Sequence, residues 1–157
     1  KDLYSSEIIK IFNSIGPKAH FHGLKNQKFV EEKTKSASIV VIPTVWNEPF
    51  GLVVAEAMSS GACIIASKVG GIPEILKNNG ILIDDINHEK LSLKLDNLIK
   101  DIRLRQNYQK KAWKNFELSC DVSSQKLDHF RRVICSNYFQ DASTLETVKQ
   151  QKLLQTK

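Results

Sequence analysis

Long hydrophobic runs are absent from this sequence of 157 residues. No apolar stretch approaches the roughly 20 residues that a membrane-spanning helix needs, and the first residues lack the basic-then-apolar pattern of a secretion signal. Cysteine is scarce as well: Cys63, Cys120 and Cys135 form no CxxC pair, and no histidine stands at metal-ligand spacing. These absences argue against a membrane span, a disulfide framework and a zinc site, and we expect a cytoplasmic protein with reduced thiols.

Excess charge of one sign is missing from the first half of the chain. Residues 1–85 contain nine basic and nine acidic side chains, whereas residues 86–157 contain fourteen basic and eight acidic ones. The whole net charge of +6 therefore lies in the C-terminal half. Such an excess indicates either a surface attracted to anionic lipid or a set of solvated helix faces. Basic residues are not interleaved with aromatic ones, which argues against a nucleic-acid partner.

The apolar pattern alternates between short continuous runs and helical periods, which is typical of an α/β chain with parallel strands. The run over 38–42 has no polar alternation, so we expect a strand that is buried on both faces. Strands are predicted over 19–22, 38–42, 62–66 and 80–83. Helices are predicted over 3–15, 26–35, 50–60 and 74–77, and then over 89–100, 102–116 and 123–139.

The predicted fold class is α/β, with a Rossmann-like parallel sheet and flanking helices. We expect one partial domain over residues 1–140, which includes the C-terminal helices, followed by a polar tail over 141–157. A domain of this class normally opens with a strand, but this chain opens with a helix and has few strands for its length. We therefore expect the first strands of the sheet to lie upstream of Lys1.

The densest signal is the segment WNEPFGLVVAEAM, which runs from Trp46 to Met58 between two predicted strands. A helix begins there near Phe50 or Gly51, and its first turn leaves backbone N–H groups without intrahelical partners. Those donors and the positive end of the helix dipole favour a bound anion such as phosphate. Gly51 would let a ligand approach the backbone closely, because no Cβ intervenes.

Two acidic residues frame this helix start. Glu48 precedes the first turn and Glu56 lies eight residues later, about 12 Å along a helix axis. The other residues of the helix leave almost no polar face, so we expect a buried helix in which Glu56 is the exception. One ligand could touch both carboxylates, with sugar hydroxyls donating to Glu56. Alternatively, Glu48 caps the helix and Glu56 pairs with a nearby lysine.

A second glycine-containing loop, VGGIPE, again joins a predicted strand to a predicted helix. Neighbouring parallel strands would place this loop at the same carboxyl edge as the first, where open α/β sheets bind ligands. Gly70 and Gly71 are therefore candidate ligand-binding residues. The alternative is a tight turn with no role in binding.

The stretch VVIPTVWNEPFGLVVAEAMSSGACIIASKVGGIPEIL resembles the C-terminal, donor-binding half of the retaining GT-B glycosyltransferases of the GT4 family, and the likeness extends to about residue 140. The family's E-x7-E motif corresponds to Glu48 and Glu56. The resemblance implies that Glu48 contacts the donor sugar and is the catalytic candidate, and that Glu56 holds the ribose. The amides of Phe50, Gly51 and Leu52 would face the sugar and diphosphate. Pro49 belongs to the same binding block, and Gly70 and Gly71 complete the candidate substrate-binding set.

The resemblance implies a hexosyltransferase that moves a sugar from a nucleotide-diphosphate donor to a glycan or lipid-linked acceptor, with no metal and no further cofactor. It also implies an upstream acceptor-binding domain and a basic pair that neutralises the diphosphate, neither of which this sequence contains. The piece alone should then be inactive. Peripheral contact with the inner face of a membrane is a further expectation. The alternatives are a non-catalytic nucleotide-sugar binding or interaction module and, less favoured, an epimerase or phosphorylase of the same architecture.

Overall fold

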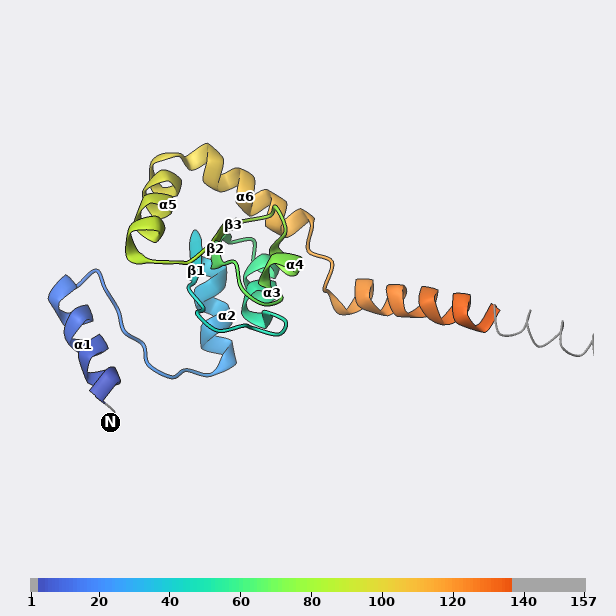
Figure 1. Ribbon diagram of the computed structural model, residues 1–157, viewed down its shortest axis with the longest axis horizontal. Coiled ribbons are helices and arrows are strands. Elements are labelled where there is room, and N and C mark those ends of the chain that lie inside the picture. The colour runs from blue at the N-terminus through green and yellow to red at the C-terminus, as the bar shows by residue number, and fades with distance from the viewer. Residues whose placement is uncertain (1–2, 137–157) are drawn as a thin grey trace, which may run out of the picture. The chain divides into compact units, whose positions relative to one another are not determined.

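The computed structural model describes residues 3–136, and their side chains from Ser6 onward. The labelled elements, in chain order, are α1 (Leu3–Ile15), α2 (Gln27–Ser36), β1 (Ile39–Ile42), α3 (Leu52–Ser59), β2 (Cys63–Ser67), α4 (Ile72–Leu76), β3 (Ile81–Ile83), α5 (His88–Lys100) and α6 (Ile102–Lys114) (Figure 1). Residues 120–136 form a further helix. The chain divides into two compact units, one up to Trp113 and one from Lys114. The predicted boundary at residue 140 lies outside the described residues.

The three strands form one parallel sheet in the order β1-β2-β3. Ile39 pairs with Cys63 at the start of β1, and Ile65 pairs with Ile81 further along the sheet. Every residue of the central strand β2 is buried. The prediction of parallel strands is confirmed, and β2 is covered on both faces, as its continuous apolar run indicates. The expectation of full burial for the run over 38–42 is wrong, because β1 is an edge strand of the described sheet and only Ile42 of it is buried.

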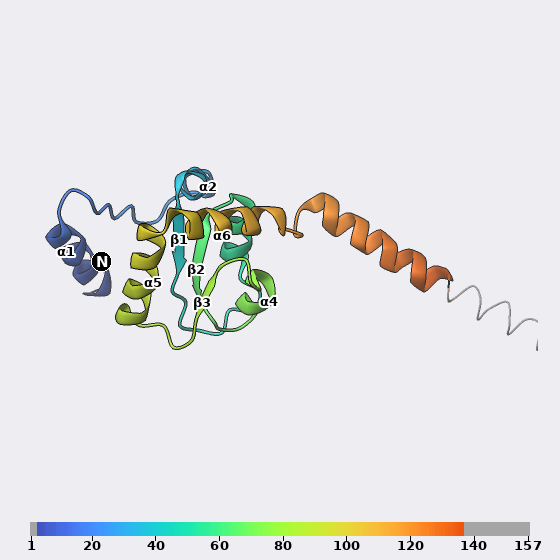
Figure 2. The same cartoon turned by 90° about the horizontal axis from the view of Figure 1, so that it is seen from above.

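Helices lie on both sides of the sheet, with α5 on one side and α3 and α4 on the other (Figure 2). On the α5 side, Cys63, Ile65 and Ile83 form a buried cluster with Leu98 of α5. Burial raises the pKa of the Cys63 thiol to about 11, against a smaller lowering effect of Arg105. Cys63 is therefore a protonated core residue at neutral pH.

The predicted strand over 19–22 is wrong. Residues 19–22 have no regular secondary structure, and β1, β2 and β3 are the strands of the sheet among the described residues. A strand is held by the hydrogen bonds of a neighbouring strand, and no described strand pairs with these residues. Phe21 instead lies 5.6 Å from Phe12 of α1, measured between ring centroids.

Helix boundaries also differ from the prediction at the loops that follow β1 and β2. α3 begins at Leu52 rather than at residue 50, because Gly51 adopts a left-handed conformation with φ of 88°. α4 begins at Ile72, two residues before the predicted start, so that Pro73 stands in its first turn, where the missing proline N–H costs no helical hydrogen bond. Among the described helices, none combines the length and the hydropathy that crossing a bilayer requires.

Candidate functional site

Two loops meet at the carboxyl edge of the sheet. The first joins β1 to α3 and carries Glu48, and the second joins β2 to α4 and carries Gly70 and Gly71. Because β1 and β2 are neighbouring parallel strands, their carboxyl ends lie at the same edge. In open α/β sheets this edge is where ligands bind.

The N-terminus of α3 is an uncapped helix end. Gly51 occupies the cap position without any side-chain hydrogen bond, and its carbonyl accepts from the amides of Val54 and Ala55. Within residues 3–136, the amides of Leu52 and Val53 have no hydrogen-bond partner. Free first-turn amides and the helix dipole are the donors that an anion needs. Contacts of this turn with a ligand stay a prediction.

Glu48 is half-buried and is held at both its side chain and its backbone. Its Oε2 accepts a long hydrogen bond of 3.4 Å from Nε1 of Trp46. Its carbonyl oxygen accepts from the amide of Gly71 at 2.8 Å. The alternative in which Glu48 caps α3 is wrong, because the cap residue is Gly51 and receives no side-chain bond.

The Gly70–Gly71 pair packs directly against the backbone of the first loop. Gly70 has φ of +53°, and a Cβ on it would overlap the carbonyl oxygen of Glu48 and lie 2.6 Å from the Glu48 nitrogen. A Cβ on Gly71 would lie 2.5 Å from the carbonyl oxygen of Pro49. The pair therefore supports the loop that presents Glu48. Contact of either glycine with a ligand remains a prediction.

Glu56 is exposed on α3, and the expectation that this helix is buried except at Glu56 is wrong. Leu52 and Val53 are 64% and 56% exposed, so the helix has an open side that the carboxylate shares. Val54, Ala57 and Met58 form its buried side. No charged partner lies within ion-pair distance of the Glu56 carboxylate in the part of the chain that the structure describes. The alternative in which Glu56 pairs with a lysine is therefore wrong for the described residues.

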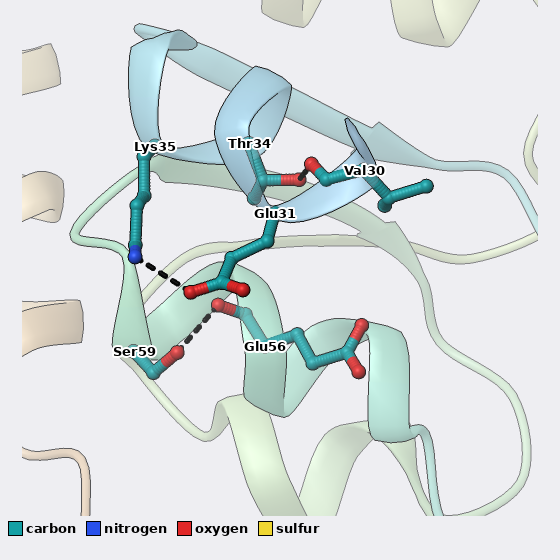
Figure 3. A network of polar contacts seen from close by, with 6 residues as sticks. All are labelled: Val30, Glu31, Thr34, Lys35, Glu56 and Ser59. Atoms are coloured by element: carbon teal, nitrogen blue, oxygen red, sulfur yellow. Dashed lines mark hydrogen bonds and ion pairs between the residues drawn. The ribbon is translucent and has the colours of Figure 1, made fainter. Parts of the chain in front are cut away.

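Figure 3 shows the surroundings of Glu56 on the side of α2. Lys35 of α2 is directed at Glu31 instead, with 2.6 Å between Nζ and Oε1, and the Glu56 carboxylate points away from that ion pair. Glu56, Thr34 and Ser59 line a cavity of about 140 Å³ between α2 and α3. The sequence pattern gave no sign of this cavity, because it depends on how two helices pack. Among the described residues, no three His, Cys, Asp or Glu side chains gather as a metal site would require.

Comparison with known proteins agrees with this architecture. The family model described as "Glycosyl transferases group 1" matches residues 8–115. The chain is 36% identical over 109 residues to the uncharacterized glycosyltransferase MJ1607 of Methanocaldococcus jannaschii, a match that covers 62% of this chain and 28% of that protein. It is 32% identical over 108 residues to the sulfoquinovosyl transferase SQD2 of Arabidopsis thaliana, which covers 66% of this chain and 21% of SQD2.

Solved structures with the same fold include the C-terminal domain of the group 1 glycosyl transferase LpcC from Francisella tularensis. It has a TM-score of 0.61 and 27% identity, covering 71% of this chain and 59% of that one. HepE from Anabaena, solved in complex with UDP, has a TM-score of 0.64 and 22% identity, covering 82% of this chain and 37% of HepE.

The parallel sheet, with the two loops at its carboxyl edge, defines a C-terminal domain of the GT-B glycosyltransferase type. The chain belongs to the group 1 glycosyltransferase family. It spans between a fifth and three tenths of the length of the curated relatives just named.

Proposed function

We propose that this chain is the donor-binding part of a retaining glycosyltransferase of the GT4 type, which transfers a hexose from a nucleotide-diphosphate sugar to a glycan or lipid-linked acceptor. The observation that most supports this proposal is the pair Glu48 and Glu56, which lie on either side of an uncapped α3 N-terminus. HepE, which shares the fold, has been solved with UDP and with UDP and glucose. That likeness supports a uridine nucleotide as the first ligand to test.

In this proposal the leaving diphosphate lies at the start of α3. The amides of Phe50, Gly51 and Leu52 donate to it and to the sugar, and the helix dipole stabilises the charge that develops on the leaving group. These donors are fixed before the reaction, so they need no reorganisation as the sugar departs. No metal or other cofactor is part of the proposal.

The two carboxylates divide the remaining contacts. Glu48 accepts hydroxyl hydrogens of the donor sugar and is the catalytic residue of the proposal, while Glu56 accepts from the ribose. Glu56 is suited to that role because its carboxylate is exposed and makes no ion pair with any described residue. Pro49 shapes the turn between Glu48 and the helix. Gly70 and Gly71 bring the second loop into contact with the backbone of the first loop, which carries Glu48.

Calorimetry with UDP, GDP and ADP on the protein that the gene encodes tests the proposal. We expect saturable binding of at least one nucleotide, and release of that nucleotide from its sugar donor when an acceptor is supplied. Binding without any transfer to a panel of glycan and lipid-linked acceptors would favour a non-catalytic nucleotide-sugar binding module. Absence of nucleotide binding would contradict both functions.

We propose peripheral membrane contact as a second property, because lipid-linked acceptors lie at a membrane surface and the basic excess follows residue 85. Several of these cations have local partners: Lys100 lies 3.6 Å from Asp96, and Arg105 donates to the carbonyl of Leu98. The remaining exposed lysines would contribute up to about 1 kcal/mol each at an anionic surface.

Co-sedimentation with vesicles measures this property. We expect the protein to bind phosphatidylserine-containing vesicles at low salt and to be released at high salt, since exposed charges are screened. Equal binding to neutral and anionic vesicles, or binding that salt does not change, would assign the basic residues to solvated helix faces.

A further inference from the structure

A second cavity, of about 300 Å³, opens at the carboxyl ends of all three strands. Thr44 follows β1, Ser67 ends β2, and Asp84 and Asp85 follow β3. The cavity contains neither Glu48 nor Glu56, so the proposed donor contacts do not account for it. Its volume lies at the lower end of the range of about 300 to 1,000 Å³ that is usual for small-molecule sites.

Ser67 is the unusual residue of this cavity. The residue is 1% exposed, and its hydroxyl has no hydrogen-bond partner among the described residues. A buried hydroxyl without a partner destabilises the folded state, because it has lost its bonds to water. Neighbouring atoms cover the oxygen, so a ligand hydroxyl would restore the missing bond after a small shift of the residues that cover it.

The charged side chains at the cavity are held in place. Lys68 Nζ lies 3.1 Å from Oδ1 of Asp84. Lys90 Nζ donates to the backbone carbonyls of Asp84 and Asp85, at 2.8 and 3.2 Å. Asp85 adopts a left-handed conformation with φ of 46°. Two ammonium groups therefore contact the loop after β3, one of them through an exposed ion pair.

This arrangement favours a neutral, hydroxylated ligand. Two aspartates, Asp84 and Asp85, are balanced there by two lysines, Lys68 and Lys90, so the site offers no net positive charge to a phosphate or another anion. The ammonium of Lys68 disfavours a metal cation. Carboxylate oxygens accept from hydroxyl groups, while Ser67 and Thr44 can both donate and accept. The apolar side chains of Val69 and Ile86 line the cavity beside them and suit the carbon face of a sugar ring.

We propose that this cavity binds a neutral sugar ring of the acceptor, an inference that rests on the proposed transferase function. Both loops of the candidate donor site also build the cavity: Thr44 precedes Glu48 on the first loop, and Val69 precedes Gly70 on the second. Because the second loop packs against the backbone of Glu48, a sugar in the cavity lies next to the loop that presents the transferred sugar.

The proposal can be tested by NMR titration of the isotope-labelled protein that the gene encodes. The methyl glycosides of glucose, galactose and mannose are added in one series and UDP in another, and amide chemical shifts are recorded. At least one glycoside should give saturable shifts at Ser67–Val69 and Asp84–Ile86, whereas UDP should shift the first turn of α3. Ser67→Ala should weaken glycoside binding by about three- to tenfold, the effect of one lost hydrogen bond. Its Tm should not fall, since the hydroxyl has no bond to lose within the described structure.

Asp85→Asn should also weaken glycoside binding, and Asp96→Asn, on the surface of α5, is the matched control that should not. UDP shifts without saturable glycoside shifts at the cavity would overturn the acceptor subsite and leave the donor function standing. Glycoside shifts without UDP binding would support the sugar site and contradict the donor function. Unchanged glycoside affinity in both Ser67→Ala and Asp85→Asn would overturn the assignment of these residues.

Discussion

Replacing Glu56 with alanine should weaken the binding of UDP and of the sugar donor together, because the ribose that this carboxylate is proposed to hold is common to both ligands. A hydrogen bond to a charged group contributes about 1.5 to 3 kcal/mol. Dissociation constants should therefore rise by about ten- to 150-fold. Glu48→Ala should instead lower turnover with less effect on UDP affinity, because its proposed partner is the transferred sugar. Calorimetry and donor-consumption kinetics measure the two effects.

Glu32→Ala provides the matched control for both substitutions. Glu32 is an exposed carboxylate on α2, so its removal changes net charge by the same amount without touching the proposed contacts. It should leave UDP affinity and turnover unchanged. If Glu48→Ala and Glu56→Ala weaken UDP binding equally, the proposed division of roles between the two acids is wrong. If all three variants behave alike, the effect is one of net charge.

The three strands could be predicted because each is a short apolar run between loop-forming residues. β2 is the clearest case: all five of its residues are buried, and a continuous apolar run of that length between loop-forming residues is too short for a typical helix. The segment over 19–22, Ala-His-Phe-His, is less apolar and has no described neighbour to pair with. Strand formation depends on a partner that local sequence does not specify.

The exposure of α3 could not be predicted for a related reason. Apolar residues on all sides of a helix indicate burial on all sides, yet Leu52 and Val53 lie on an open side. Helix burial is decided by what packs against each face. The same limit applies to the contact between Gly70 and Glu48, which are 22 positions apart in the sequence. The glycines were predicted at the site, but their packing against the Glu48 backbone required the structure.

Gly70→Ala should have the largest effect on both stability and activity. The left-handed conformation costs a non-glycine residue about 1 to 2 kcal/mol, and the overlap of the new Cβ with the Glu48 backbone adds about 1 to 3 kcal/mol of overpacking. We therefore expect the free energy of unfolding in urea to fall by about 2 to 5 kcal/mol. Displacing the Glu48 loop by about 1 Å would lower turnover by about 100-fold.

Gly16→Ala distinguishes backbone strain from steric overlap as the cause of the lost stability and activity in Gly70→Ala. Gly16 also has a left-handed φ, of +89°, but nothing lies within 4 Å of a Cβ built there. Its replacement should cost only the conformational strain of about 1 to 2 kcal/mol and should leave turnover unchanged. The comparison is made at a temperature where circular dichroism shows both variants folded. Equal losses of stability and activity in the two variants would mean that the second loop does not hold Glu48 in place, since backbone strain alone would then explain the result.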